Sequence, residues 1–284
     1  MALAGPKQRK EPGRKRFAYE KVNAMWQADI SSGPYIKMGK RKVPTFLFAF
    51  LDDASRLVPY ALYTPNQGFD SLKTVFKEAL SRRGIPQMIY ADNGKIYTSQ
   101  QFQWVCASLG IALVHTKPYD PSAKGKIERF FLSVRQRFLS ALDYEGLTLD
   151  SLNESFLSWL EKDYNSRPHS AIGMSPIDMY MSQSSSLKML DDPSVLEPLF
   201  LRREIRKVRH DSTISVQNHL FEVPPALVGK RVEVRFDPDD LSEVLIYDEG
   251  VEVARTRPVN LHENARVKRE KPALRLSELD AQEE

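Results

Sequence analysis

Three carboxylates stand out because of the residues around them: Asp29, Asp92 and Glu128. Asp29 ends a short mixed segment, Asp92 follows the apolar run 88–91, and Glu128 lies in a helical pattern. Two aspartates on neighbouring strands and a glutamate on a helix would supply the hard oxygen ligands that Mg²⁺ or Mn²⁺ prefers. Such a site suits a two-metal phosphodiester displacement, so the pattern predicts chemistry that cuts or joins nucleic acid.

The spacing of these carboxylates is a weak signal by itself, because the chain has 37 acidic residues. Asp92 could simply shape an Asp-Asn-Gly turn, and Glu128 could be a solvated helix residue. Their strand-to-turn and helical settings favour the catalytic interpretation. Asp52 and Asp53 are rival ligands by composition, but a turn between two strands favours Asp for conformational reasons, so we interpret both as structural.

The hydrophobic pattern predicts the elements that would position these residues. Strands are expected at 25–30, 43–51, 57–63, 87–91 and 111–116, with helices at 70–83, 99–109 and 123–142. A strand, a helix and a further strand imply a right-handed crossover, which would set the ends of the first and fourth strands side by side. Asp29 and Asp92 should then converge, because adjacent strands lie about 4.8 Å apart.

The 284 residues, 42% of them hydrophobic, are enough for a sizeable core and a smaller module. Ser, Asp and Pro clusters predict a linker, and five short alternating strands after it predict a small all-β barrel. We expect a basic arm at 1–18, a catalytic core with a helical extension at 19–181, the linker at 182–201, the barrel at 202–260 and a charged tail at 261–284.

The formal charge of +4 is unevenly distributed along the chain. Six basic residues and a single acid, Glu11, lie within the first sixteen residues, which predicts a disordered arm. This arm could be a solubilising tail, but we favour phosphate contact. Cys106 is the only cysteine, so no disulfide forms within the chain, and its apolar neighbours predict a core position.

The sequence lacks the features of zinc-binding, membrane-spanning and secreted proteins. The five histidines lack ligand spacing, so no zinc cluster is expected. No hydrophobic run approaches the length of a membrane span, and no apolar stretch of signal-peptide type follows the basic start. We therefore expect a cytoplasmic protein without membrane association, located at the nucleoid when bound to DNA.

Several motifs resemble the integrase-type transposase group, which comprises retroviral integrases and bacterial insertion-sequence and Mu-like transposases with an RNase H-like core. The resemblance covers residues 19–181, and the 35 residues between Asp92 and Glu128 match the family's separation. The module at 202–260 is similar in pattern and position to the barrel of Mu-like transposases. The matching motifs are Trp26-Gln27-Ala28-Asp29, Leu51-Asp52-Asp53-Ala54-Ser55-Arg56, Ala91-Asp92-Asn93-Gly94 with Tyr97, Pro118-Tyr119-Asp120-Pro121 with Gly125-Lys126-Ile127-Glu128-Arg129, and Tyr164-Asn165 with Arg167-Pro168-His169 and Ser175-Pro176.

The resemblance implies an α/β fold, an RNase H-like mixed five-stranded sheet with flanking helices, followed by the small all-β barrel. It implies that Asp29, Asp92 and Glu128 are the catalytic and metal residues of a polynucleotidyl transferase and hold two Mg²⁺ or Mn²⁺ ions. The reactions implied are hydrolytic release of a 3′-OH at an element end and attack of that hydroxyl on target DNA. The implied partners are element ends, target DNA, further copies of the chain and an accessory transposition protein.

Cations near the glutamate are candidate DNA-binding residues. Lys124, Lys126, Arg129 and Arg135 could form a solvated helix face, but we favour phosphate contact because phosphates must approach the metals. The resemblance places Tyr119 and Lys124 at positions that contact the element end, and Arg135 at one that meets DNA further along the helix.

The amino-terminal region departs from the family pattern. Family members usually carry a helix-turn-helix or zinc-binding module before the core, and only about eighteen residues precede it here. End recognition would then reside elsewhere, or the chain is shortened. Two other hypotheses follow: a nuclease of RNase H type that only hydrolyses, and a shortened transposase that binds element ends as a regulator.

Overall fold

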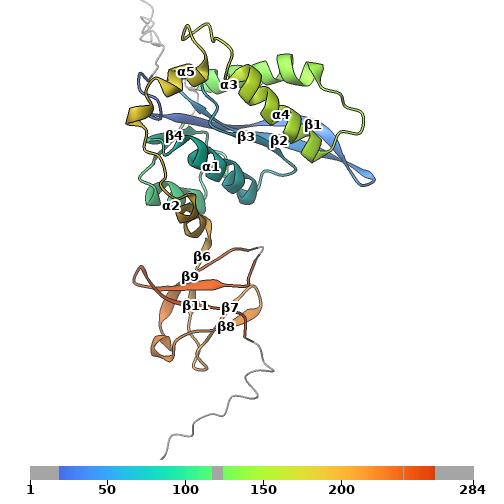
Figure 1. The fold of residues 1–284 in the computed structure, drawn as a ribbon. Helices are drawn as coiled ribbons and strands as arrows, with labels where there is room; N and C mark the ends of the chain where they lie inside the picture. The colour runs from blue at the N-terminus through green and yellow to red at the C-terminus, as the bar shows by residue number, and fades with distance from the viewer. Residues whose placement is uncertain (1–18, 117–123, 239, 260–284) are drawn as a thin grey trace, which may run out of the picture. The chain divides into compact units, whose positions relative to one another are not determined.

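The computed structural model describes residues 19–116, 124–238 and 240–259. The chain forms two compact units, residues 1–200 and 201–284, and each is considered by itself (Figure 1). The predicted arm at 1–18, the tail at 261–284 and Tyr119 lie outside the described residues and remain predictions.

A five-stranded mixed sheet forms the centre of the first unit. Its strands are β1 (Trp26–Met38), β2 (Arg41–Asp52), β3 (Ala61–Thr64), β4 (Met88–Ala91) and β5 (Ala112–His115). The order across the sheet is β3-β2-β1-β4-β5, with β1 to β3 antiparallel and with β4 and β5 parallel to β1. The predicted mixed sheet is confirmed, and so is the parallel pairing of the first and fourth strands.

Helices cover both faces of this sheet. They are α1 (Phe69–Arg83) and α2 (Gln100–Ser108) on one face, and α3 (Gly125–Ser133) and α4 (Leu149–Trp159) on the other (Figure 1). Successive side chains of β2 point to opposite faces, so Phe48 and Phe50 pack with Phe76 while Leu47 packs in the cluster of Phe130. Two hydrophobic layers therefore hold the sheet from both sides.

The helix predicted at 123–142 is helical over nearly that range but changes type along its length. The further helical segments are η2 (Val134–Phe138, a π-helix), η3 (Leu139–Ala141), η4 (Leu160–Tyr164), α5 (Pro176–Met181), η5 (Ser184–Ser186) and η6 (Pro193–Phe200). The apolar stripe continues from α3 into η2, where Val134 and Phe138 are buried. No helix among the described residues is long and apolar enough to cross a membrane.

β1 is longer than the strand predicted at 25–30, and it forms a hairpin with β2 that extends along its whole length. The register shifts between Ser32 and Tyr35, which marks an irregularity in the ladder. Gly33 lies at this point, where an added Cβ would come within 2.6 Å of the Tyr63 ring. The Ser-Ser-Gly-Pro sequence therefore forms an irregular part of a strand, although such residues usually separate strands.

The segment 182–201, expected as a linker, contributes to the core. Leu196 and Phe200 of η6 are both buried in the core of the first unit. The Phe200 ring lies 6.0 Å from that of Phe76. Cys106 is buried in the same core, as its apolar neighbours predicted.

The second unit is an all-antiparallel β region with its own core. Its strands are β6 (Arg202–Lys207), β7 (Thr213–Val216), β8 (His219–Glu222), β9 (Arg231–Phe236), β10 (Val244–Asp248) and β11 (Val251–Thr256). They form a four-stranded sheet, β11-β10-β9-β6, and a two-stranded sheet, β7-β8. The expected five strands are present, and Phe221, Val234 and Ile246 fill the interior between the two sheets.

β6 is a sixth strand that the sequence pattern did not predict. It carries three arginines, Arg202, Arg203 and Arg206, which lie close to carboxylates. Arg202 Nε lies 2.9 Å from Glu204 Oε1, Arg206 also pairs with Glu204, and Arg203 lies 3.9 Å from Glu233. Neighbouring carboxylates therefore offset part of the positive charge of these arginines.

Candidate active site

The fold brings Asp29 and Asp92 together, as the sequence predicted. Asp29 lies in β1 and Asp92 follows β4, the parallel neighbour of β1. The Lys124 ammonium lies between them, 3.0 Å from Asp29 Oδ1 and 3.2 Å from Asp92 Oδ2. Two carboxylates that arrive from separate strands therefore converge on one cation.

Burial and neighbouring charges perturb the titration of this pair. Burial raises the pKa of Asp29, an effect that Lys124 partly opposes and that the negative charge of Asp92 increases. The buried Tyr97 hydroxyl shows the same influence, because burial first and then the charges of Asp29 and Asp92 raise its pKa well above the ordinary value. A site of this kind favours a bound cation.

The turn after β4 fixes the Asp92 side chain. The Gly94 backbone N–H donates a hydrogen bond to Asp92 Oδ1 at 2.8 Å. A Cβ at Gly94 would lie only 2.7 Å from the same oxygen, so a larger residue would displace the carboxylate. Asn93 donates to the Thr116 carbonyl at 2.9 Å, and His115 Nδ1 lies 2.9 Å from the Asp92 carbonyl oxygen. Contacts from the end of β5 thus complete the turn.

Glu128 occupies an exposed position on the first turns of α3. Glu128 lies four residues after Lys124, the residue that precedes α3. No group of three or more His, Cys, Asp or Glu side chains in the described ranges is close enough to hold one metal ion. The structure thus gathers two of the three predicted ligands and leaves the third one helical turn from the cation that joins them.

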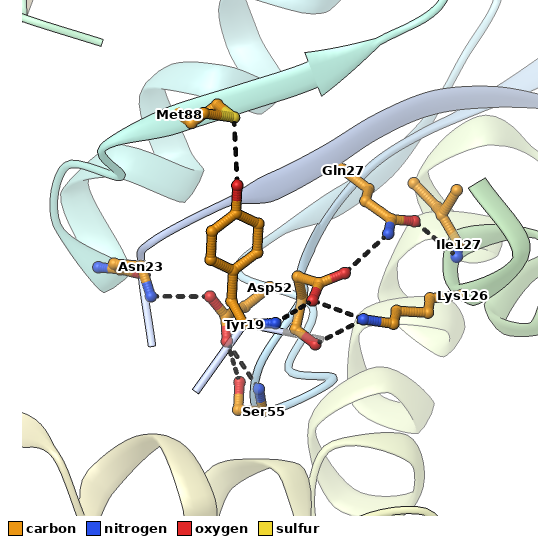
Figure 2. A network of polar contacts seen from close by, with 9 residues as sticks. Tyr19, Asn23, Gln27, Asp52, Ser55, Met88, Lys126 and Ile127 are labelled. Atoms are coloured by element: carbon orange, nitrogen blue, oxygen red, sulfur yellow. Dashed lines mark hydrogen bonds and ion pairs between the residues drawn. The ribbon is translucent and has the colours of Figure 1, made fainter. Parts of the chain in front are cut away.

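A buried polar network holds α3 against the sheet (Figure 2). Gln27 Nε2 donates to Asp53 Oδ1 at 3.0 Å, and Gln27 Oε1 accepts from the Ile127 backbone N–H at 3.1 Å. Lys126 Nζ lies 2.5 Å from Asp53 Oδ2. Gln27 and Asp53 are each 1% exposed, so these bonds are shielded from water. The sequence analysis assigned no separate role to Gln27, although this residue lies in the motif Trp26-Gln27-Ala28-Asp29.

The carboxylates of the β2–β3 turn are saturated by protein donors. Asp52 accepts from the Asn23 N–H at 2.8 Å and from the backbone and hydroxyl of Ser55 at 2.8 and 2.6 Å. Asp53 also accepts from the Tyr19 N–H at 2.9 Å (Figure 2). These contacts agree with the structural interpretation of both residues.

The predicted DNA-binding cations fall into two groups. Lys124 and Lys126 are held by carboxylates within the protein, and burial lowers the pKa of Lys126 while Asp53 opposes that change. Arg129 and Arg135 are exposed. The exposed pair is free to meet a phosphate, whereas each lysine would first have to leave its carboxylate partner.

Comparisons with known proteins agree with this geometry. Two models of the "Integrase core domain" match residues 20–121 and 109–176, and a "Mu transposase, C-terminal" model matches residues 197–255. The chain is 31% identical over 250 residues to the transposase for transposon Tn552 of Staphylococcus aureus, which covers 79% of this chain and 52% of that protein. The chain thus spans about half the length of that relative.

Two viral proteins are also similar to this chain. The Gag-Pro-Pol polyprotein of Human T-cell leukemia virus 3 (strain Pyl43) is 32% identical over 107 residues, which is 38% of this chain and 7% of that protein. A cryo-EM structure of the simian T-cell lymphotropic virus intasome in complex with PP2A regulatory subunit B56 gamma matches with a TM-score of 0.54 and 19% identity, covering 88% of this chain and 81% of that chain.

The mixed sheet, its flanking helices and the intasome match define an RNase H-like integrase core fold followed by an antiparallel β region. The motifs around the three carboxylates lie in the matched segments, and the relative with the longest alignment given above is a transposase. The family matches and the Tn552 relative together support the integrase-type transposase group for this chain.

Proposed function

We propose that this protein is a DNA transposase that releases a 3′-OH at the end of a mobile element and transfers that end to target DNA. The observation that carries the proposal is the convergence of Asp29 and Asp92 on a single cationic group, the Lys124 ammonium. The Tn552 transposase likeness over 79% of the chain supports the same activity.

The site residues fit divalent ions. Asp29 and Asp92 present oxygen donors of the hard type that Mg²⁺ and Mn²⁺ prefer, in surroundings that raise the pKa of Asp29. Asp29, Asp92 and Glu128 would hold two such ions. When bound, the ions would supply activation of a water or 3′-OH nucleophile and stabilisation of the leaving 3′ oxygen.

The other residues prepare the site for the substrate. Gly94 orients the Asp92 carboxylate through its backbone N–H. Gln27 and Lys126 hold the start of α3, which carries Glu128, against the sheet. Lys124 holds the two aspartates together before metal ions bind. Once its ammonium leaves them, it becomes available to a DNA phosphate.

The two reactions balance without a covalent protein intermediate. In cleavage, a water oxygen attacks the phosphorus, the bond from phosphorus to the 3′ oxygen breaks, and the strand end receives the proton. In joining, the freed 3′ oxygen attacks a target phosphorus and one target phosphodiester is exchanged for a new one. Joining therefore needs no energy source of its own.

Element ends, target DNA and further copies of this chain are the proposed partners, with an accessory transposition protein as an additional one. Incubation of the full chain with Mg²⁺, plasmid target and labelled duplexes copied from repeats flanking its gene tests the activity. Joined products support the proposal, whereas cleavage alone would indicate the nuclease and binding alone the regulator. Asp92→Asn and Glu128→Gln should each abolish both products while DNA binding persists.

A further inference from the structure

A groove of about 670 Å³ lies away from the three carboxylates, between the β1–β2 hairpin and the segment from η2 to the start of α4. The hairpin extends past the short strands of the sheet (Figure 1). The Lys37 backbone N–H donates to the Leu147 carbonyl at 3.2 Å, which joins the two walls. The groove therefore has fixed sides.

The lining of this groove is strongly basic. Lys37, Lys40, Arg41 and Lys42 come from the hairpin, and Arg135 comes from η2. No acidic residue lines the groove, and none of these five cations forms an ion pair with a carboxylate in the described part of the chain. All five are exposed, so their charges are available to an anionic partner.

The strand register places like charges directly opposite each other. Lys37 pairs with Lys42 across the hairpin, an arrangement that destabilises a sheet. Lysines on exposed strands also discourage pairing with other chains, which would explain the hairpin residues alone. That explanation does not extend to Arg135, which adds a fifth positive charge to the same groove from a separate helical element.

The groove shares its supporting elements with the carboxylates. Lys37 follows Asp29 by eight residues along β1, a distance of at most about 26 Å. Arg135 follows Glu128 by seven residues, or about 10 Å along a helix. The larger distance corresponds to roughly eight base pairs of duplex at about 3.4 Å per step.

We propose that this groove binds the phosphodiester backbone of duplex DNA several base pairs from the phosphate that reacts. The inference rests on the proposed function and adds a second contact region to it. Five cations without acidic neighbours match the regular negative charge of a DNA backbone. Contacts to phosphates position a duplex without reading its sequence, which suits a groove lined by flexible lysines.

The test compares two variants of the full chain that have the same net charge as each other. Lys37→Gln/Lys40→Gln/Lys42→Gln removes three groove charges, and Lys21→Gln/Lys162→Gln/Lys188→Gln removes three exposed charges elsewhere. Binding to a random-sequence 30-base-pair duplex and to the corresponding single strand is measured in EDTA over a range of salt concentrations. Equal thermal unfolding of both variants establishes that they are folded.

The groove variant should lose about 2 to 3 units from the slope of log affinity against log salt for the duplex. The control variant should retain the wild-type slope. Equal slopes for the two variants, or a loss confined to the single strand, would overturn the proposal. Binding is measured without metal, so it does not depend on catalysis. If the groove variant loses slope as expected but the wild type joins no ends, the proposed function is refuted while the proposed DNA binding in the groove still holds.

Discussion

The side-chain oxygen of Gln27 accepts a hydrogen bond from the backbone N–H of Ile127 at 3.1 Å. Gln27 lies two residues before Asp29 in β1, and Ile127 immediately precedes Glu128 in α3. This bond therefore links the strand that carries one proposed metal ligand to the helix that carries another. The amide nitrogen of the same side chain donates to Asp53, so one buried side chain connects three segments.

Gln27→Met should disturb catalysis more than folding. The change keeps the side-chain length but leaves the Ile127 N–H and one Asp53 oxygen without these partners, at a cost of about 1–3 kcal/mol in the free energy of unfolding. Because α3 loses an anchor, we expect joining to fall at least tenfold while DNA affinity changes little. Denaturant unfolding and strand-joining assays measure the two effects.

Gln103→Met is the matched control for that substitution, because the Gln103 amide donates to the Thr98 carbonyl at an exposed site. Unchanged joining is expected for this control. Equal joining by Gln27→Met and the wild type would show that the bond to Ile127 does not position Glu128.

Gly94→Ala should impair the Asp92 carboxylate without unfolding the protein. The new methyl group would meet Asp92 Oδ1 at 2.7 Å, so the carboxylate must rotate away from the position set by the Gly94 N–H. We expect a higher Mg²⁺ requirement and a joining rate lower by tenfold or more. Titration of the reaction with Mg²⁺ measures this effect.

Gly125→Ala provides the folding control, since no atom of the described residues lies within 4 Å of a Cβ at that position. Thermal unfolding of both alanine variants should stay close to that of the wild type. An unaltered Mg²⁺ requirement in Gly94→Ala would remove the proposed role of this glycine.

Asp53→Asn should destabilise the fold and leave metal binding in place. The substitution breaks the pair with Lys126, whose ammonium is left partly buried, at a cost of up to about 3 kcal/mol because the lysine is not fully enclosed. Denaturant unfolding measures the loss, and Mg²⁺-induced stabilisation of the variant should match that of the wild type. A loss of the Mg²⁺ effect would instead make Asp53 a metal ligand.

The sequence predicted the parts of the fold whose local pattern agrees with their long-range packing. The apolar run of β2 and the strand leading to Asp92 are both short, continuous and bounded by turn residues, so they were recognised. The parallel pairing of β1 with β4 then places Asp29 beside Asp92. At these positions the strands predicted from the local sequence pattern are the strands that form in the folded protein.

Other parts depend on contacts that a linear pattern does not show. β6 has no apolar alternation, and it forms because its backbone pairs with β9 at the edge of a sheet, where charged side chains are tolerated. The role of Gln27 depends on two partners that lie 26 and 100 positions further along the chain. The ammonium of Lys124 between the aspartates likewise becomes visible only in three dimensions.

Asp29 provides a test of the site that needs no DNA. Burial raises the pKa of its carboxyl above the ordinary value, so the folded protein holds this proton to higher pH than the unfolded chain. Between the two pKa values the folded state binds more protons, and stability from this group therefore falls as pH rises through that window. The full penalty of the buried charge is therefore present above the folded-state pKa.

Asp29→Asn should consequently raise the unfolding temperature of the metal-free protein in EDTA at pH 7. The difference from the wild type should disappear below the ordinary Asp pKa, where both side chains are neutral. Mg²⁺ should stabilise the wild type, because an ion that binds only the folded state adds to its stability, and it should stabilise Asp29→Asn far less. Asp191→Asn, at an exposed site, should follow the wild type in every condition. A lower unfolding temperature for Asp29→Asn in EDTA would show that the ion pair with Lys124 outweighs the penalty of burial, and equal Mg²⁺ stabilisation would remove Asp29 from the metal site.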